Sequence, residues 1–124
     1  MDTPEREAAF HRALGEAWPA GYAAYRSNWQ AWAEQQFVAD YPLLVDVELS
    51  SVCNLTCPMC YTITDEFKRR VNSTRMDFGL YKKIIDEIGG KVPALRLSLR
   101  GEATLHTKFA ECIAYAKEKG VREV

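Results

Sequence analysis

The sequence predicts an α/β fold in which parallel strands alternate with helices. Residues 43–49 begin as a continuous apolar run, and a second run at residues 94–99 follows Pro93. Each run is followed by a segment with apolar residues at helical spacing, at residues 77–88 and 108–119. Three of the four cysteines lie directly after the first run. These observations predict a parallel sheet that carries a site at the carboxyl ends of its strands.

Composition limits the class of protein. The chain has 124 residues, 48% of them hydrophobic, and a net charge of −1, so it can bury one ordinary core. The near-neutral charge gives no reason to expect nucleic acid or an acidic membrane as a partner. No apolar run approaches the roughly 20 residues that a membrane span needs, and no signal peptide is evident. We expect a cytoplasmic protein.

Residues 1–40 are predicted to form a helical extension. Thr3 can cap a first helix that begins at Pro4 and ends before Gly21. A second helix over residues 22–38 carries an aromatic stripe at helical spacing, which includes Tyr22, Tyr25, Trp29 and Trp32. The stripe is interpreted first as packing against the following domain and second as a surface for a partner protein or peptide.

The two helices beyond the extension have recognisable caps and faces. Asp77 is a candidate N-cap, and Gly89 and Gly90 end that helix. Its apolar face is expected to comprise Leu80, Ile84, Ile85 and Ile88. The face of the second helix contains Phe109, Cys112, Ile113 and Ala116. This places Cys112 in the core rather than among metal ligands.

Three shorter segments complete the chain. Residues 61–75 are polar and are interpreted as a solvated surface, with an anion site as the alternative. His106 is interpreted as a capping residue of its loop rather than a group that faces a cofactor. Residues 121–124 resemble the opening of a third strand.

The cysteine triplet Cys53, Cys57 and Cys60 has C-x3-C-x2-C spacing. A disulfide framework is disfavoured, because three clustered cysteines leave one unpaired and no signal peptide precedes them. Structural zinc usually takes four ligands in two separated pairs. Three thiolates suit an iron-sulfur cluster with one iron left open to another ligand.

This spacing, after a first strand, resembles the cluster loop of radical S-adenosylmethionine (radical SAM) enzymes. A second stretch, residues 97–102, resembles their next strand with its Gly-Glu ending, although the usual Gly-Gly-Glu reads Arg-Gly-Glu here. The resemblance implies that Cys53, Cys57 and Cys60 bind a 4Fe-4S cluster, with no catalytic residue assigned beyond these ligands. It implies cofactor-binding roles for four further residues, Met59, Tyr61, Gly101 and Glu102, with Glu102 accepting a hydrogen bond from the amino group of S-adenosylmethionine.

The same resemblance implies a fold and a reaction. Residues 41–124 would be the first two and a half units of a partial (β/α)6 TIM-like barrel, with the remainder beyond residue 124 and the fragment alone inactive. The activity would be that of an oxidoreductase: the cluster reductively cleaves S-adenosylmethionine to a 5′-deoxyadenosyl radical, which abstracts hydrogen from an unidentified substrate, with a peptide as one candidate. A one-electron reductant such as a flavodoxin or ferredoxin would be a partner.

Two other functions are compatible with the residues. A non-catalytic zinc or iron-sulfur module, structural or electron-transferring, would complete its ligands with Cys112, His106 or a partner's residue. An interaction module would act through the aromatic stripe of the extension instead.

Overall fold

The computed structural model describes residues 3–19 and 21–124. The chain divides into two compact units, Met1–Leu43 and Leu44–Val124, which are described separately. Residues 1, 2 and 20 of the expected helical extension lie outside the described residues.

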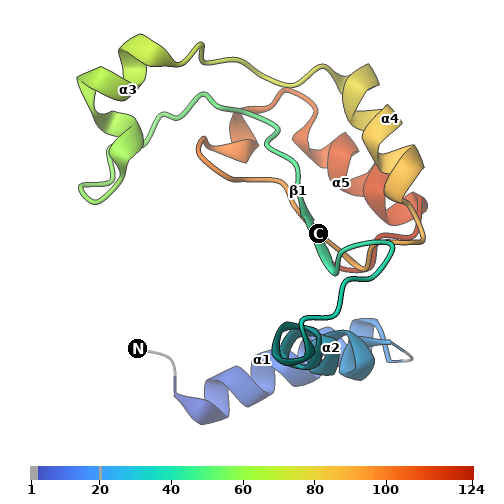
Figure 1. Cartoon of the computed structure of the whole chain (residues 1–124). Helices are drawn as coiled ribbons and strands as arrows, with labels where there is room; N and C mark the ends of the chain where they lie inside the picture. The colour runs from blue at the N-terminus through green and yellow to red at the C-terminus, as the bar shows by residue number, and fades with distance from the viewer. Residues whose placement is uncertain (1–2, 20) are drawn as a thin grey trace. The chain divides into compact units, whose positions relative to one another are not determined.

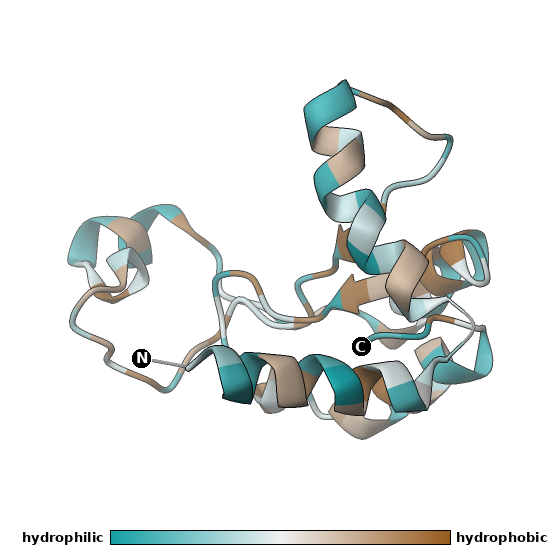
Figure 2. Ribbon diagram, turned by 90° about the horizontal axis from the view of Figure 1, so that it is seen from below, coloured by the Kyte–Doolittle hydropathy of each residue, from teal (hydrophilic) through white to brown (hydrophobic). Residues whose placement is uncertain are grey.

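The first unit is a pair of helices, α1 (Pro4–Ala17) and α2 (Tyr22–Gln35). The Thr3 side chain accepts a hydrogen bond from Arg6 N at 3.4 Å, which confirms the predicted cap. Hydrophilic and hydrophobic residues both occur along α1, next to the N label in Figure 2. The helix α2 ends before the expected residue 38, because Gln36 adopts a left-handed conformation with φ 52°.

Part of the aromatic stripe packs within this unit. Tyr22 and Tyr25 are buried, and the Trp18 ring lies 5.5 Å from the Tyr25 ring, centroid to centroid. The Tyr22 hydroxyl is 2.6 Å from His11 Nδ1 on α1. The aromatic spacing therefore holds α1 against α2, and Trp29 is left partly exposed.

The second unit is built on a short parallel sheet of β1 (Leu44–Asp46) and β2 (Ala94–Arg96). Leu44 is paired with Ala94, and Asp46 with Arg96. Both strands are shorter than predicted, but backbone bonds continue the pairing, with Val47 N donating to Arg96 O and Leu49 N to Leu97 O. Among the described residues the sheet has two strands and no barrel is formed, so the barrel stays a prediction.

The expected third strand begins beside β2. Leu95 N donates to Glu123 O at 2.8 Å, and Ala94 and Glu123 form an isolated parallel bridge. The start of a third parallel strand at residues 121–124 therefore has direct backbone evidence.

Helices α4 (Phe78–Ile88) and α5 (Phe109–Glu118) lie side by side, as Figure 1 shows. The Asp77 carboxylate accepts from Leu80 N at 2.9 Å, which confirms the predicted N-cap of α4. Shorter elements fill the connections, namely η1 (Tyr61–Ile63), α3 (Asp65–Arg70) and η2 (Ala103–Leu105). Helix α3 was not predicted, since residues 61–75 read only as a polar surface.

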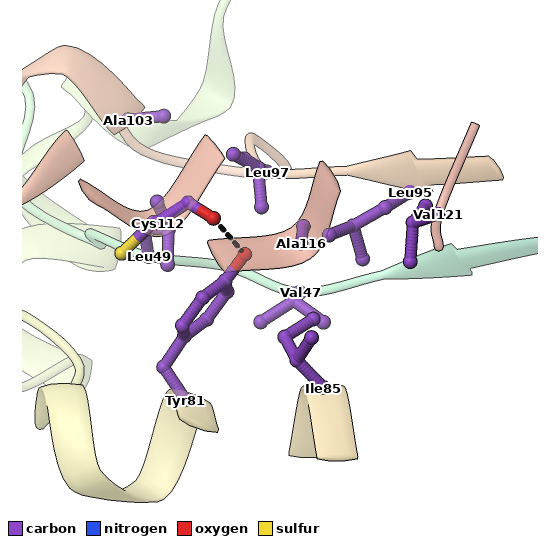
Figure 3. Close-up of a cluster of buried hydrophobic side chains, with 10 residues drawn as sticks. All are labelled: Val47, Leu49, Tyr81, Ile85, Leu95, Leu97, Ala103, Cys112, Ala116 and Val121. Atoms are coloured by element: carbon purple, nitrogen blue, oxygen red, sulfur yellow. Dashed lines mark hydrogen bonds between the residues drawn. The ribbon is translucent and has the colours of Figure 1, made fainter. Parts of the chain in front are cut away.

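The core lies between the sheet and helices α4 and α5. Figure 3 shows its buried side chains, which are Val47, Leu49, Tyr81, Ile85, Leu95, Leu97, Ala103, Cys112, Ala116 and Val121. The Tyr81 hydroxyl donates to the Cys112 carbonyl at 2.8 Å, so this buried polar group is satisfied. Cys112 packs in the core as predicted, and burial raises the pKa of its thiol to about 11.

The predicted face of α4 was wrong at one position. Leu80 is 51% exposed, whereas its neighbour Tyr81 is buried. Tyr81 and Ile85 lie one turn apart and together fill the core-facing side of α4. Because Tyr81 occupies the core-facing side of α4, the Leu80 side chain is left exposed to solvent.

No helix in the described part of the chain is both long and apolar enough to cross a membrane.

Candidate functional site

The cysteine loop leaves the end of the first strand at a firmly held point. Ser50 is buried, and Ser51 N donates to Thr74 O at 2.9 Å. Met76 N donates to Leu49 O at 2.8 Å, which ties the same point to the segment before α4. Residues 51–57 beyond it have no regular secondary structure. These bonds to residues 74–76 therefore fix where the cysteine loop begins.

The three thiols are accessible. Cys53 and Cys57 are exposed, Cys60 is partly exposed, and Cys60 N donates to Cys57 O at 2.9 Å in a turn. Cys60 Sγ lies 3.0 Å from Thr62 Oγ1, and this hydrogen bond lowers the pKa of the Cys60 thiol. Cys53 lines a cavity of about 230 Å³, which Thr56, Phe67 and Lys68 also line.

The donor set suits iron in type and number. Cysteine thiolates are the ligands that iron-sulfur clusters use, and three of them leave one iron open. Within residues 3–19 and 21–124, no three His, Cys, Asp or Glu side chains are grouped as metal ligands. The structure thus places the three predicted ligands on one accessible loop without bringing their sulfur atoms together.

The Gly-Glu segment lies against the start of the cysteine loop. A Cβ atom on Gly101 would lie 2.1 Å from Ser50 O and 2.8 Å from the Ser51 carbonyl carbon. Glu102 N donates to Val52 O at 2.9 Å, one residue before Cys53. Glycine is therefore required at position 101 for this close approach of two backbones. The contact brings the two predicted motifs to one edge of the sheet.

The Glu102 carboxylate is held by its own loop. Its Oε1 accepts from Thr104 N at 3.1 Å and from Thr104 Oγ1 at 2.7 Å, which caps η2. These bonds lower the pKa of Glu102, so the side chain is anionic at neutral pH. Both bonds are to Oε1, and a carboxylate can accept further bonds through its second oxygen. Glu102 can therefore receive an ammonium group while it stays capped.

Arg100, the residue before Gly101, is bound to Glu48. Arg100 N and Nε donate to Glu48 Oε2 at 2.9 and 3.0 Å, and Arg100 Nη2 donates to Oε1 at 2.7 Å. The Glu48 side chain is 14% exposed, and the Arg100 donors lower the pKa of its carboxyl group. This pairing was not predicted, because the sequence of residues 43–49 indicates only a buried strand and assigns no role to Glu48.

The two remaining predicted cofactor contacts are on the surface. Met59 is 86% exposed and Tyr61 is 59% exposed. The Tyr61 ring packs edge-to-face on Phe67 of α3, with centroids 5.2 Å apart. They lie on the same stretch as Cys60, and their contact with a cofactor stays a prediction.

His106 lies in the loop between the Gly-Glu segment and α5 and forms hydrogen bonds with two backbone groups. Its Nδ1 accepts from Lys108 N at 3.1 Å, so the neutral ring carries its proton on Nε2, which donates to Met76 O at 2.8 Å. This supports the predicted capping role. Arg75 Nε also donates to Leu105 O at 2.6 Å, a contact that the sequence gave no reason to expect.

Comparison with known proteins gives one distant relative. The chain is 33% identical over 79 residues to a Pyrococcus furiosus protein named tungsten-containing aldehyde ferredoxin oxidoreductase cofactor-modifying protein. The match covers 60% of this chain and 20% of that protein, so the chain spans about a fifth of the length of this curated relative. No family model matches the chain, and no solved structure matches it. The chain is thus similar to part of a protein that is named as a modifier of a cofactor.

Proposed function

We propose that these residues form the cluster-binding and cofactor-binding edge of a radical SAM enzyme. The observation that carries the proposal is the contact between the two motifs. Glu102 N donates to Val52 O, directly before Cys53, and Gly101 lies against the Ser50 carbonyl. A thiol-rich loop and a carboxylate that can accept from an ammonium group therefore share one edge of a parallel sheet, where α/β proteins place their sites.

Each residue has a defined part in this proposal. Cys53, Cys57 and Cys60 would hold three irons of a 4Fe-4S cluster, and Glu102 would accept a hydrogen bond from the amino group of S-adenosylmethionine. The backbone of Gly101 would lie close to the cofactor. Met59 and Tyr61 would also contact it. When bound, the cluster and S-adenosylmethionine supply the 5′-deoxyadenosyl radical that abstracts hydrogen from a substrate. The protein orients the cofactor and excludes side reactions.

The fold, partners and substrate belong to the same proposal. Residues 41–124 would be the first part of a partial (β/α)6 barrel in the cytoplasm, with a flavodoxin or ferredoxin as the electron donor. A peptide is one candidate substrate. The name of the Pyrococcus furiosus relative adds a cofactor or cofactor precursor as a second candidate.

The alternative function, a non-catalytic metal module, is disfavoured because two of its candidate ligands are poorly suited to bind a metal. Cys112 is buried in the core, where its pKa is raised to about 11, and both ring nitrogens of His106 already have backbone partners. A fourth ligand for a closed zinc site would then have to come from a partner.

Anaerobic reconstitution with iron and sulfide tests the ligand assignment. The protein that carries these residues should bind about four irons and four sulfides per chain, as a 4Fe-4S cluster requires, and replacement of Cys53, Cys57 or Cys60 by Ala should abolish the cluster absorbance. Cys112→Ala is the matched control and should keep the iron content. Zinc without sulfide, or full iron content in all three loop variants, would contradict the proposal.

A further inference from the structure

The face of the sheet opposite the core carries two carboxylate–guanidinium pairs of the same geometry. Arg96 Nε and Nη2 donate to the two oxygens of Asp46 at 2.7 and 2.6 Å. Glu48, two residues after Asp46 and beyond the end of β1, is bound by Arg100 in the same forked way. Two-oxygen forks of this kind fix the orientation of both partners. The pairs differ in what they are attached to.

The Glu48–Arg100 pair reaches the Gly-Glu loop, whereas the Asp46–Arg96 pair joins residues in register within β1 and β2. Glu48 also accepts from the backbone N–H of Arg100 at 2.9 Å, so one carboxylate holds both the main chain and the side chain of that residue. Arg100 directly precedes Gly101. The pair therefore fixes the direction in which the chain enters positions 101 and 102.

Two further bonds hold the same loop. Ser98 Oγ donates to Gly101 O at 3.0 Å, and Glu102 N donates to Val52 O at 2.9 Å. Both act on residues 101 and 102 themselves, while Glu48 is the anchor at position 100. Loss of Glu48 would leave the loop held at residues 101 and 102 but without this anchor at residue 100.

The pair also controls charge. Arg100 lies two residues before Glu102, whose anionic carboxylate accepts two hydrogen bonds from Thr104 in its own loop. With Glu48 present, the guanidinium has a carboxylate partner at 2.7 Å. Without it, the Arg100 cation would have no carboxylate partner, and only Gly101 separates it in sequence from Glu102, for which it would compete with a ligand's ammonium group.

We propose that Glu48 and Arg100 are positioning residues for the proposed cofactor site: they fix the Gly101–Glu102 loop and keep the Glu102 carboxylate available to the amino group of S-adenosylmethionine. This inference rests on the proposed function. Neither residue is proposed to touch the cofactor. They act through Gly101 and Glu102.

The test measures S-adenosylmethionine binding, by equilibrium dialysis, to the anaerobically reconstituted protein that carries these residues. Glu48→Gln and Arg100→Gln should each raise the Kd about tenfold, the loss typical of residues that orient a ligand-binding group. The double variant should bind no more weakly than the worse single variant, because both changes remove the same pairing. Iron content should stay at the wild-type value in all three.

Asp46→Asn and Arg96→Gln are the matched controls, since they break a fork of the same geometry that does not reach the loop. They should leave the Kd within about twofold of wild type, the scatter expected for independent sites. Thermal unfolding of each variant checks that the fold is kept, and Arg100→Lys replaces Arg100→Gln if the latter fails to fold.

The possible results distinguish failure of the positioning role from failure of the proposed function. If the wild-type protein with its cluster does not bind S-adenosylmethionine, the proposed function fails and the positioning role fails with it. If the wild type binds and the Glu48 and Arg100 variants bind equally well, only the positioning role is overturned. Equal weakening in the Asp46 and Arg96 controls would also overturn it, because the effect would then belong to the sheet as a whole.

Discussion

Gly101 lies so close to Ser50 that a Cβ atom at position 101 would come within 2.1 Å of the Ser50 carbonyl oxygen. The neighbouring carbons Ser50 C and Ser51 C would each be 2.8 Å away. All three are backbone atoms, so they cannot move aside as a flexible side chain would. The two motifs of the candidate site are therefore joined by a contact that admits only glycine.

Gly101→Ala should separate the cysteine loop from the Gly-Glu segment. Overpacking of this kind costs about 1–3 kcal/mol or more of unfolding free energy, which denaturant unfolding measures. Gly15→Ala in α1 is the control, because its Cβ would lie 3.5 Å from Tyr22 Cδ1 in ordinary contact. That variant should gain about 0.5–1 kcal/mol from helix propensity. Equal stability of the two variants would show that the close approach is absent.

The buried hydroxyl of Tyr81 gives a second prediction. Tyr81→Phe leaves the Cys112 carbonyl without its side-chain donor inside the core, so the free energy of unfolding should fall by about 1–2 kcal/mol. Tyr115→Phe is the comparison, since the Tyr115 hydroxyl donates to the exposed Asp86 at 2.7 Å. Its removal should cost less, because water replaces the lost partner. A larger loss for Tyr115→Phe would contradict the packing of Tyr81.

Thiol accessibility gives a third prediction. In the metal-free protein at pH 8, iodoacetamide should modify the exposed Cys53 and Cys57 rapidly and spare Cys112. With its pKa raised to about 11, only about one Cys112 thiol in a thousand is ionised at that pH, and burial hinders the reagent as well. Peptide mass mapping follows each site. Modification of Cys112 at the rate of Cys57 would place it outside the core.

The Glu48–Arg100 pair predicts a pH dependence of stability. The Arg100 donors lower the pKa of Glu48 below its ordinary value of 4.5, so the unfolded chain takes up this proton first as the pH falls. The stabilisation is complete above about pH 4.5 and is lost as the pH falls through the folded-state pKa.

Thermal unfolding of wild type and Glu48→Gln measures this directly. The Tm difference between them should be largest near pH 7 and should shrink below about pH 4.5. Asp86, whose pKa is lowered by Lys119, has the same effect in both proteins, so the difference isolates Glu48. A constant difference from pH 7 to about pH 3 would contradict the assigned shift.

The parts of the fold that the sequence predicted well depend on local signals. Asp77 caps α4 and Thr3 caps α1, because a capping signal acts within a few residues. The parallel pairing of the two apolar runs is long-range, but the order strand, helix, strand predicts it. Leu80 shows where this fails. Helical spacing allows either Leu80 or Tyr81 to face the core, and the choice is made by the Cys112 carbonyl on another helix.

In the candidate site, too, local features were predicted and long-range contacts were not. Cysteine spacing predicted the type and number of donors, but not the conformation of residues 51–57, which no strand or helix ladder fixes. The contact of Glu48 with Arg100 joins residues 52 positions apart, and no local pattern reports such a pairing. The Gly101 contact with Ser50 is also long-range, so the sequence predicted the glycine and not the reason for it.

The proposed function requires that Cys53, Cys57 and Cys60 support reductive cleavage of S-adenosylmethionine. The most direct test is to reconstitute the protein that carries these residues with iron and sulfide under anaerobic conditions, reduce it with dithionite, and quantify 5′-deoxyadenosine by liquid chromatography. 5′-Deoxyadenosine should form with wild type and with Cys112→Ala, and should not form with Cys57→Ala. An intact cluster that binds S-adenosylmethionine and yields no 5′-deoxyadenosine, or equal yield from Cys57→Ala, would contradict the proposed function.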